Sequence, residues 1–376
     1  MPAGTHMLMA GFMLLAVMTI ATGCKKAHIP KALKDFNQVN LVANNASYGA
    51  AHIDPVLLNA WGIAFSSGGT PWVASQAGHV STVYDKEGVT VRPPVNIPSP
   101  GGATGGNPTG VVFSGSATDF ILSNGQPARF IFVGVDGILS AWNGGAGNNA
   151  FLVKNNSATS AYTGLTLAAN AGANYLYAAN FRTGKIDVWD KNFAPVAMTF
   201  KDPSLPWGYA PFNIQVVGSW LYVLYAKVGA DGKDQPGPGN GFVSIFTTAG
   251  SFVKRFVSRG YLNAPWGIAM TPTGFFEDLD EDDSKNGKSG HGNSGNDFDE
   301  PLLLVGNFGD GRINVYTQDG QFLGQLKSHG HTVVIDGLWA LTFPPATATT
   351  IDPNRLYFAA GPDDEKDGLF GYIIKD

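Results

Sequence analysis

The chain of 376 residues is mildly acidic and poor in charge, with 24 Lys and Arg against 29 Asp and Glu and 14% charged residues. A soluble domain usually carries about 25%, so this surface must be polar through Gly, Asn, Ser and Thr. The net charge of −5 argues against nucleic-acid binding, and a single cysteine excludes a disulfide framework or a Cys-based zinc site. What remains is a large, turn-rich globular protein.

An apolar run lies near the N-terminus. Residues 7–22 read MLMAGFMLLAVMTIAT; this is shorter than the ~20 residues of a membrane span, and it ends in small residues as a secretory signal does. Because the only cysteine follows Ala-Thr-Gly, the segment resembles a bacterial lipobox, which implies cleavage before Cys24 and lipidation of its thiol. We expect a lipoprotein-type signal peptide over 1–23 and a tether over 24–35, which would hold the protein at a bacterial membrane, in the periplasm or at the cell surface. The alternative is an anchor helix with an incidental cysteine.

Internal repeats indicate the fold. Six segments begin alike: Trp61-Gly62-Ile63-Ala64, Thr109-Gly110-Val111-Val112, Thr163-Gly164-Leu165-Thr166, Phe212-Asn213-Ile214-Gln215, Trp266-Gly267-Ile268-Ala269 and Trp339-Ala340-Leu341-Thr342. Their starts are 48 to 54 residues apart except for the last interval of 73, which contains a 24-residue insertion. A unit of about 50 residues with four short strands is the blade of a β-propeller. The sequence therefore predicts an all-β, six-bladed propeller over residues 36–376.

The chain ends suggest how the ring closes. The last repeat supplies three strands, at 338–343, 355–360 and 369–374. Residues 36–43 lie before the first repeat and would provide the missing fourth strand, which removes the open edges of a sheet. The alternative is an open sandwich of short strands, which gives no reason for six similar units.

The insertion over residues 277–300 is acidic and rich in Gly, Asn and Ser. It carries nine acidic residues against two lysines, so the rest of the chain has a charge of about +2. Asp278, Asp280 and Asp282 are candidate Ca²⁺ ligands, but the Gly and Glu that an EF-hand loop needs at its sixth and twelfth positions are missing. We expect a flexible solvated loop in blade 5, on the rim opposite the candidate site.

Several motifs resemble known propellers. The runs Trp-Gly-Ile-Ala, Leu-Tyr-Ala-Ala-Asn and Lys-Ile-Asp-Val-Trp-Asp resemble NHL repeats. A longer ordered set, including NLVAN, LNAWGIA, LNAPWG, VGNFGDG, IDGLW and GPDDE, resembles an uncharacterised bacterial family of secreted six-bladed propellers. Members of that family often carry a PEP-CTERM sorting tail; here we expect the lipobox-like segment to serve as the anchor instead. The resemblance implies the fold and brings no activity or catalytic residues.

Hairpin geometry places a candidate site at one mouth of the channel. The innermost strand of a blade starts at the Trp-Gly position and the second strand returns, so the second strand ends on the rim where the first begins. That rim collects Asn59, Trp61, Gln76, His79, Asp136, Asn180, Arg182, Asn263, Trp266, Asn307, Asp310, Asp336, Trp339, Asp363 and Asp364. Amides and carboxylates bind hydroxyls or a cation, and aromatic faces take up apolar surface. The structural alternative is that each Trp packs between blades and each Asn closes a turn.

Catalytic motifs are few. His329 and His331 lie two residues apart, but a metal site needs a third ligand, so we interpret them as part of a solvated loop. There is no Gly-x-Ser-x-Gly elbow and no cysteine after Cys24, and the sequence identifies no catalytic residue.

We therefore expect a monomeric binding or scaffolding module for a polar ligand, glycan or protein, with no required cofactor. Its other contact would be the membrane, through the lipid anchor. The alternative is a metal-assisted hydrolase, lactonase or lyase at the channel mouth, which rests on fold analogy. Rim oxygens or His79 converging within ~2.0–2.6 Å of one point on the axis would favour that alternative.

Overall fold

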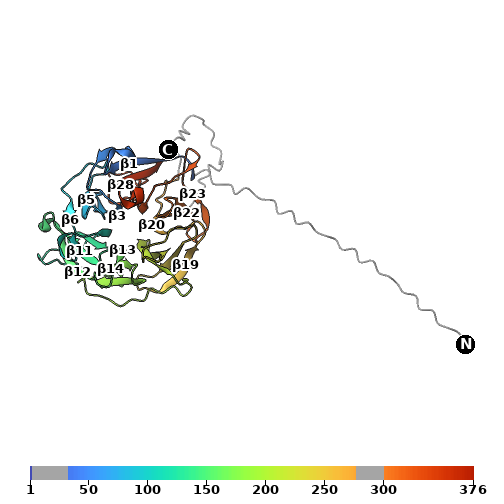
Figure 1. The fold of residues 1–376 in the computed structure, drawn as a ribbon, viewed down its shortest axis with the longest axis horizontal. Helices are drawn as coiled ribbons and strands as arrows, with labels where there is room; N and C mark the ends of the chain where they lie inside the picture. Colours follow the sequence, from blue (N-terminus) through green and yellow to red (C-terminus); the bar gives the residue numbers. More distant parts are fainter. Residues whose placement is uncertain (2–32, 277–299) are drawn as a thin grey trace, which may run out of the picture.

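The computed structural model describes Met1 and residues 33–276 and 300–376. In this part the chain forms six antiparallel blades around a central axis (Figure 1), which confirms the predicted six-bladed β-propeller. The predicted signal peptide, Cys24 and all of the acidic insertion except Glu300 lie outside the described residues. Within the described ranges, no helix has the length and apolar character needed to cross a bilayer.

Each blade begins with its innermost strand. Blade 1 contains β3 (Ala60–Phe65), β4 (Pro71–Ser75), β5 (Val80–Val83) and β6 (Val95–Asn96). Blade 2 contains β9 (Pro108–Phe113), β10 (Phe130–Gly134), β11 (Ile138–Trp142) and β12 (Phe151–Asn155). Blade 3 contains β13 (Tyr162–Asn170), β14 (Ala173–Asn180) and β15 (Lys185–Asp190).

The second half of the ring repeats this arrangement. Blade 4 contains β16 (Tyr209–Val217), β17 (Trp220–Lys227), β18 (Gly241–Phe246) and β19 (Phe252–Ser258). Blade 5 contains β20 (Pro265–Met270), β21 (Leu303–Asn307), β22 (Ile313–Tyr316) and β23 (Phe322–Gln325). Blade 6 contains β26 (Leu338–Thr342), β27 (Leu356–Ala360), β28 (Leu369–Lys375) and β1 (Phe36–Ala43).

The loops contain several short strands and helical turns. They are β2 (His52–Ile53), the pairs β7 (Pro98–Ser99) with β8 (Gly102–Gly105) and β24 (Lys327–Ser328) with β25 (His331–Thr332), the 3-10 turns η2 (Ala46–Tyr48) and η3 (Gly144–Ala146), and the one-turn α1 (Pro362–Glu365).

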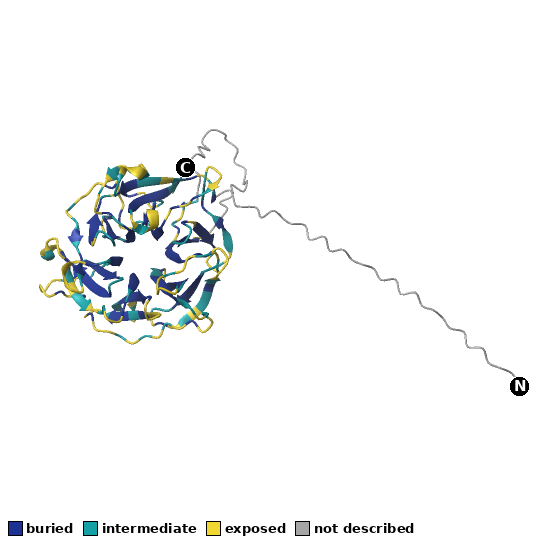
Figure 2. Ribbon diagram, in the orientation of Figure 1, coloured by how far each residue is buried: buried dark blue, intermediate teal, exposed yellow. Residues whose placement is uncertain are grey.

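The core consists of layers between neighbouring blades. Along β10, Phe132 packs with Trp72 of blade 1, whereas the adjacent Ile131 packs with Leu165 of blade 3. Successive side chains of a strand point to opposite faces, so a central strand with two covered faces needs a continuous apolar run. Burial accordingly decreases from the inner strands to the outermost ones (Figure 2), where β12 is half exposed.

The ring closes through the two ends of the chain, as predicted. Strand β1 pairs antiparallel with β28, from Phe36 opposite Lys375 to Ala43 opposite Leu369. This pairing gives blade 6 its outer strand and leaves the first and last strands of the domain paired. Figure 1 shows the blue β1 beside the red β28.

Two boundaries differ from the expectation. Blade 3 has three paired strands instead of four, because its fourth segment contains Pro195, which forms an isolated bridge with Trp189 and lacks the N–H that a ladder needs. The expected tether extends to residue 35, yet Leu33 is fully buried in the cluster that contains Phe36 and Phe275. The packed domain therefore begins before residue 36.

The repeated glycine lets adjacent inner strands approach closely. A Cβ on Gly62 would lie 2.6 Å from the Thr109 carbonyl oxygen, and a Cβ on Gly164 would lie 2.0 Å from Asn213 Oδ1. In blade 4 the glycine is replaced by Asn213, whose Nδ2 donates to the Trp266 carbonyl oxygen of blade 5 at 2.8 Å. The glycine that recurs after the repeat start thus reflects the narrow contact between blades at the axis.

Gly62→Ala should lower the free energy of unfolding by about 1–3 kcal/mol, the usual cost of overpacking, because the new methyl group would clash with backbone atoms of β9. Urea denaturation followed by fluorescence would measure it. Gly101→Ala is the matched control, since its Cβ meets no atom within 4 Å. Equal stability of the two variants would contradict this account of the repeat.

Candidate functional site

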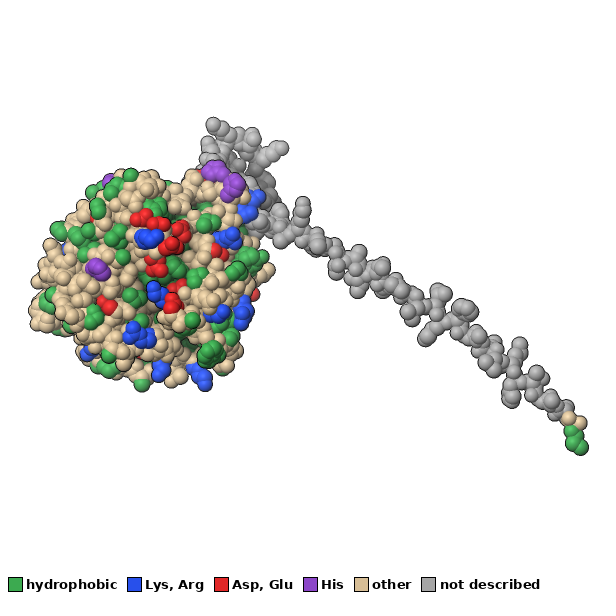
Figure 3. Space-filling view, in the orientation of Figure 1, with side chains coloured by type: hydrophobic (Ala, Val, Ile, Leu, Met, Phe, Trp, Pro, Cys, Tyr) green, Lys and Arg blue, Asp and Glu red, His purple; other side chains and the backbone are tan. Residues whose placement is uncertain are grey.

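The predicted site residues lie on one rim of the propeller. Each precedes or begins an inner strand, or follows the second strand of its blade. Figure 3 shows this face, with Asp and Glu side chains gathered near its centre. We call this rim the mouth. Placement on one rim agrees with the hairpin argument, whereas ligand binding by these residues stays a prediction.

An aromatic plug closes the axis beneath the mouth. Trp61 stacks on Trp339 with ring centroids 3.5 Å apart, and Phe308 stacks on the same indole at 3.9 Å. Trp266 meets both other indoles edge to face, and its Nε1 donates to the Thr163 carbonyl oxygen of blade 3 at 2.8 Å. The exposed fractions of Trp61, Trp266 and Trp339 are 5%, 4% and 1%. The expectation of open aromatic faces is therefore wrong, because these rings cover one another.

Asn59 connects the plug to the mouth. Its Oδ1 accepts the Nε1–H of Trp339 at 2.9 Å, and its Nδ2 donates to Gln76 Oε1 at 3.0 Å and to Glu365 Oε2 at 2.7 Å. The residue is buried and has a φ of 46°, a region that Asn tolerates better than most residues. One amide therefore fixes the orientation of an indole below it and a carboxylate above it.

Two other buried asparagines, Asn180 and Asn307, form hydrogen bonds with backbone groups. Asn180 Oδ1 accepts from the Ala161 N–H at 3.2 Å. Asn307 Oδ1 accepts from the Asn263 N–H at 3.1 Å, and its Nδ2 donates to Asp310 Oδ1 at 3.0 Å. These contacts agree with the structural alternative for the asparagines.

His79 and Asp136 lie on the blade 1 and blade 2 side of the mouth. His79 Nδ1 is 3.0 Å from the Gly106 carbonyl oxygen, and Asp136 Oδ2 accepts from the Asn107 N–H at 3.0 Å. Burial raises the pKa of Asp136, and its Oδ1 is buried without a hydrogen-bond partner among the described residues. Both side chains are thus held mainly by backbone groups.

The loop after β27 carries the acidic centre of the mouth. Asp363, Asp364 and Glu365 all have left-handed φ values, 56°, 53° and 67°, which are costly for residues other than glycine. The Asp363 N–H donates to Asp336 Oδ2 at 3.1 Å. Lys366 Nζ lies 3.5 Å from Asp363 Oδ2 and 3.9 Å from Asp364 Oδ2, in the exposed setting where ion pairs contribute little.

Asp234, which the sequence reasoning missed, belongs to the same region. It lies in the loop after β17, and burial together with the negative charge of Glu365 raises its pKa to about 6. Its Oδ2 is buried without a hydrogen-bond partner in the described part of the chain. The carboxylates of Asp234 in blade 4 and Glu365 in blade 6 thus lie close enough for the charge of one to affect the other.

The described residues of the mouth do not form a metal-binding site. Among residues 33–276 and 300–376, no group of three or more His, Cys, Asp or Glu side chains is arranged to hold a metal ion. His329 and His331 are exposed, and Arg182 donates to the Ser157 carbonyl oxygen at 3.1 Å. The candidate Ca²⁺ ligands Asp278, Asp280 and Asp282 lie outside the described residues.

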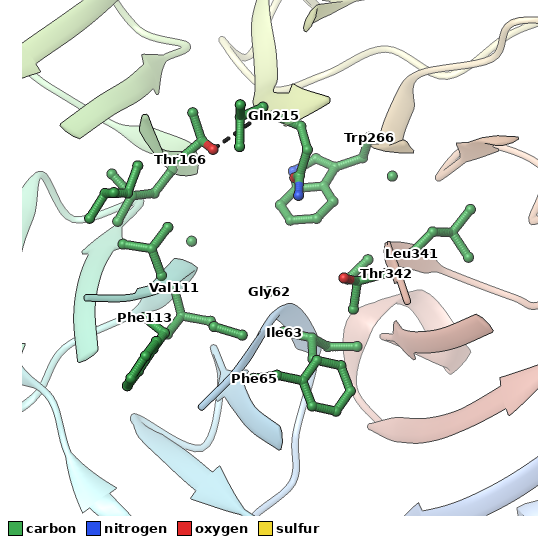
Figure 4. Close-up of a pocket in the computed structure, with 18 residues that line it drawn as sticks. Gly62, Ile63, Phe65, Val111, Phe113, Thr166, Gln215, Trp266, Leu341 and Thr342 are labelled. Carbon is green, nitrogen blue, oxygen red and sulfur yellow. Dashed lines mark hydrogen bonds between the residues drawn. The ribbon is translucent and has the colours of Figure 1, made fainter. Parts of the chain in front are cut away.

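A concavity that was also missed from the sequence lies at the other end of the channel. It is a pit of about 230 Å³ lined by the inner strands of all six blades (Figure 4). Ile63, Val111, Gln215 and Thr342 contribute to its wall, and Trp266 separates it from the rest of the plug. The pit is lined by residues of the inner strands from the repeat start onward, whereas most mouth residues precede an inner strand or follow a second strand.

The fold and the plug define the class: a six-bladed β-propeller whose channel is closed by stacked aromatic side chains. No protein-family model matches the chain. It is 33% identical over 362 residues to "Uncharacterized protein L690" of Acanthamoeba polyphaga mimivirus, covering 90% of this chain and 86% of that protein. It is 34% identical over 361 residues to "Uncharacterized protein R648" of the same virus, covering 90% and 80%. The chain belongs to the family of these viral proteins.

Solved propellers are more distant. A streptogramin B lyase structure has a TM-score of 0.47 with 14% identity and covers 90% of this chain and 97% of its own. A gluconolactonase from Xanthomonas campestris has a TM-score of 0.46 with 14% identity, covering 84% and 86%. Neither likeness carries an argument about activity. The relatives found by sequence are viral, so a bacterial family of origin stays a prediction.

The pKa of Asp234 makes the mouth sensitive to pH. Because its folded-state pKa is about 6 and lies above the unfolded value, the native state binds more protons between about pH 4 and pH 6, and stability falls as pH rises through that window. Asp234→Asn should therefore stabilise the protein at pH 8, by roughly 1–3 kcal/mol, and have little effect at pH 4. Urea midpoints at both pH values measure this.

Asp231→Asn is the control for that measurement, because it removes the same charge from an exposed position in the same loop. A gain at pH 8 that is equal for the two variants would show that general charge repulsion, and not burial of Asp234, is responsible.

Proposed function

We propose that this propeller is a binding module that recognises a basic segment of a partner protein at the mouth. The observation that carries the proposal is the exposed acidic loop over a closed channel: the Asp363 and Asp364 side chains are 61% and 96% exposed, while the plug below is buried. A ligand at this face would therefore contact exposed carboxylates on the surface and would not enter the channel. Clustered carboxylates attract and orient Lys and Arg side chains.

The chemistry of the mouth favours a protein over a glycan. Sugar rings are commonly bound by stacking on open aromatic faces, and on the mouth side the indoles of Trp61, Trp266 and Trp339 are covered. The polar amides below the surface already bond to the protein itself. The carboxylates of Asp336, Asp363 and Asp364 are exposed to a partner, with Lys366 beside them.

We further propose that the propeller is held at an extracytoplasmic membrane surface of a bacterium through lipidated Cys24. The support is the apolar run over residues 7–22 followed by the small residues before the cysteine. The described domain begins near Leu33, so a short segment would separate it from the anchor.

The mouth proposal is tested with decalysine as the probe. Asp363→Asn combined with Asp364→Asn should weaken its binding about 5- to 20-fold in low salt, since each exposed charge contributes up to about 1 kcal/mol, and Asn tolerates the left-handed backbone. Fluorescence anisotropy of labelled decalysine measures the affinity. The control is Asp319→Asn with Asp352→Asn, two acids in loops on the opposite rim. Equal weakening by both pairs would reject the mouth as the recognition surface.

The anchor is tested with Cys24→Ser in the full chain expressed in a bacterial host. The variant should leave the membrane fraction and remain a folded soluble propeller, because the substitution lies outside the packed domain. Fractionation followed by immunoblotting measures this. Retention of the variant at the membrane would refute lipidation at Cys24.

A further inference from the structure

The pit at the far end of the channel has the size and the enclosing walls of a small-molecule binding site. Its wall comes from β3, β9, β13, β16, β20 and β26, and its volume is about 230 Å³. Trp266 forms the inner limit, since it lines the pit and also packs edge to face on Trp61 and Trp339. The pit is therefore closed on the plug side.

The lining combines apolar side chains with backbone polar groups and carries no charged side chain. Each inner strand has a hydrogen-bonded neighbour on one side alone, so the N–H and C=O groups of its other edge face the axis. Ile63 and Val111 contribute apolar surface to the wall of the pit (Figure 4). A neutral ligand suits these walls, because a buried charge without a partner is costly.

Gln215 supplies a free polar group. Its side chain reaches toward the axis beside Trp266 (Figure 4), and within the described part of the chain its carboxamide makes no hydrogen bond. The two threonines of the wall are engaged: Thr166 Oγ1 accepts from the Val216 N–H at 3.1 Å, and Thr342 Oγ1 donates to the Phe343 carbonyl oxygen at 3.2 Å. Among the polar side chains of the wall, Gln215 is thus the one whose polar atoms make no hydrogen bond within the described residues, and it is best placed to orient a ligand.

We propose that the pit binds a neutral, compact amphipathic molecule of about ten non-hydrogen atoms, whose apolar ring or short chain lies against Trp266 and whose single polar group hydrogen-bonds to Gln215. The size follows from the volume, because a cavity of about 150 Å³ accepts benzene. This site is independent of the mouth, from which the plug separates it, and it would add a ligand-dependent function to a protein-binding propeller.

The probes are 2-naphthol and its isostere 2-methylnaphthalene, which differ in one hydroxyl group. Saturation-transfer NMR on the purified protein should give saturable binding of both. Gln215→Leu should weaken 2-naphthol about 3- to 10-fold, the effect of one lost hydrogen bond, and change 2-methylnaphthalene less than twofold. Ile63→Trp should abolish binding of both by filling the pit.

The matched control is Gln321→Leu, which makes the same change at an exposed turn between β22 and β23 and should leave both affinities unchanged. Circular dichroism confirms that each variant is folded. No saturable binding to the wild-type protein, or binding that survives Ile63→Trp, would overturn the site; equal loss of the two probes in Gln215→Leu would overturn the role of the carboxamide. The Asp363→Asn and Asp364→Asn pair should bind both probes normally, so failure at the mouth and failure at the pit can be told apart.

Discussion

The stack of Trp61, Trp339 and Phe308, crossed by Trp266, is the contact on which the rest of the molecule depends. Blades 1, 5 and 6 place these rings on the axis, and the Trp266 indole reaches blade 3 through its hydrogen bond to the Thr163 carbonyl oxygen. Aromatic pairs contribute ≈ 0.5–1.5 kcal/mol each beyond their burial. The rings therefore connect blades that share no sheet, while β1 and β28 close the circumference.

The plug also explains why the propeller has two dissimilar ends. Above it, Asn59 links an indole to Glu365, and the acidic loop covers the centre of the mouth. Below it, the inner strands leave an uncharged pit with one free carboxamide, that of Gln215. A continuous channel would mix these two environments. Because the rings separate them, one end is suited to a charged surface partner and the other to a neutral small molecule.

The ring of blades could be predicted from the sequence because its causes are local. Six similar segments at a spacing of about 50 residues, alternating apolar residues and a spare N-terminal strand were enough to place all six blades. The missing fourth strand of blade 3 was not predicted, although Pro195 explains it, because proline cannot complete a ladder. The packing of the tryptophan rings into a plug could not be predicted, because a tryptophan at a strand start can face either solvent or neighbouring side chains. Asp234 and Glu365 come from loops of two blades that are distant in sequence, so their proximity could not be predicted. No local pattern distinguishes Gln215, which lines the pit, from a solvent-exposed glutamine.

Hydrogen exchange of the tryptophan indole N–H groups tests the closed channel most directly. The Nε1–H of Trp266 and of Trp339 are hydrogen-bonded within the plug, whereas the side chain of Trp207 is 99% exposed. With ¹⁵N-labelled tryptophan, exchange at Trp266 and Trp339 should be at least about a hundredfold slower than at Trp207, as expected of groups that open only by local unfolding. Exchange at the plug as fast as at Trp207 would contradict a sealed axis and, with it, the separation of mouth and pit.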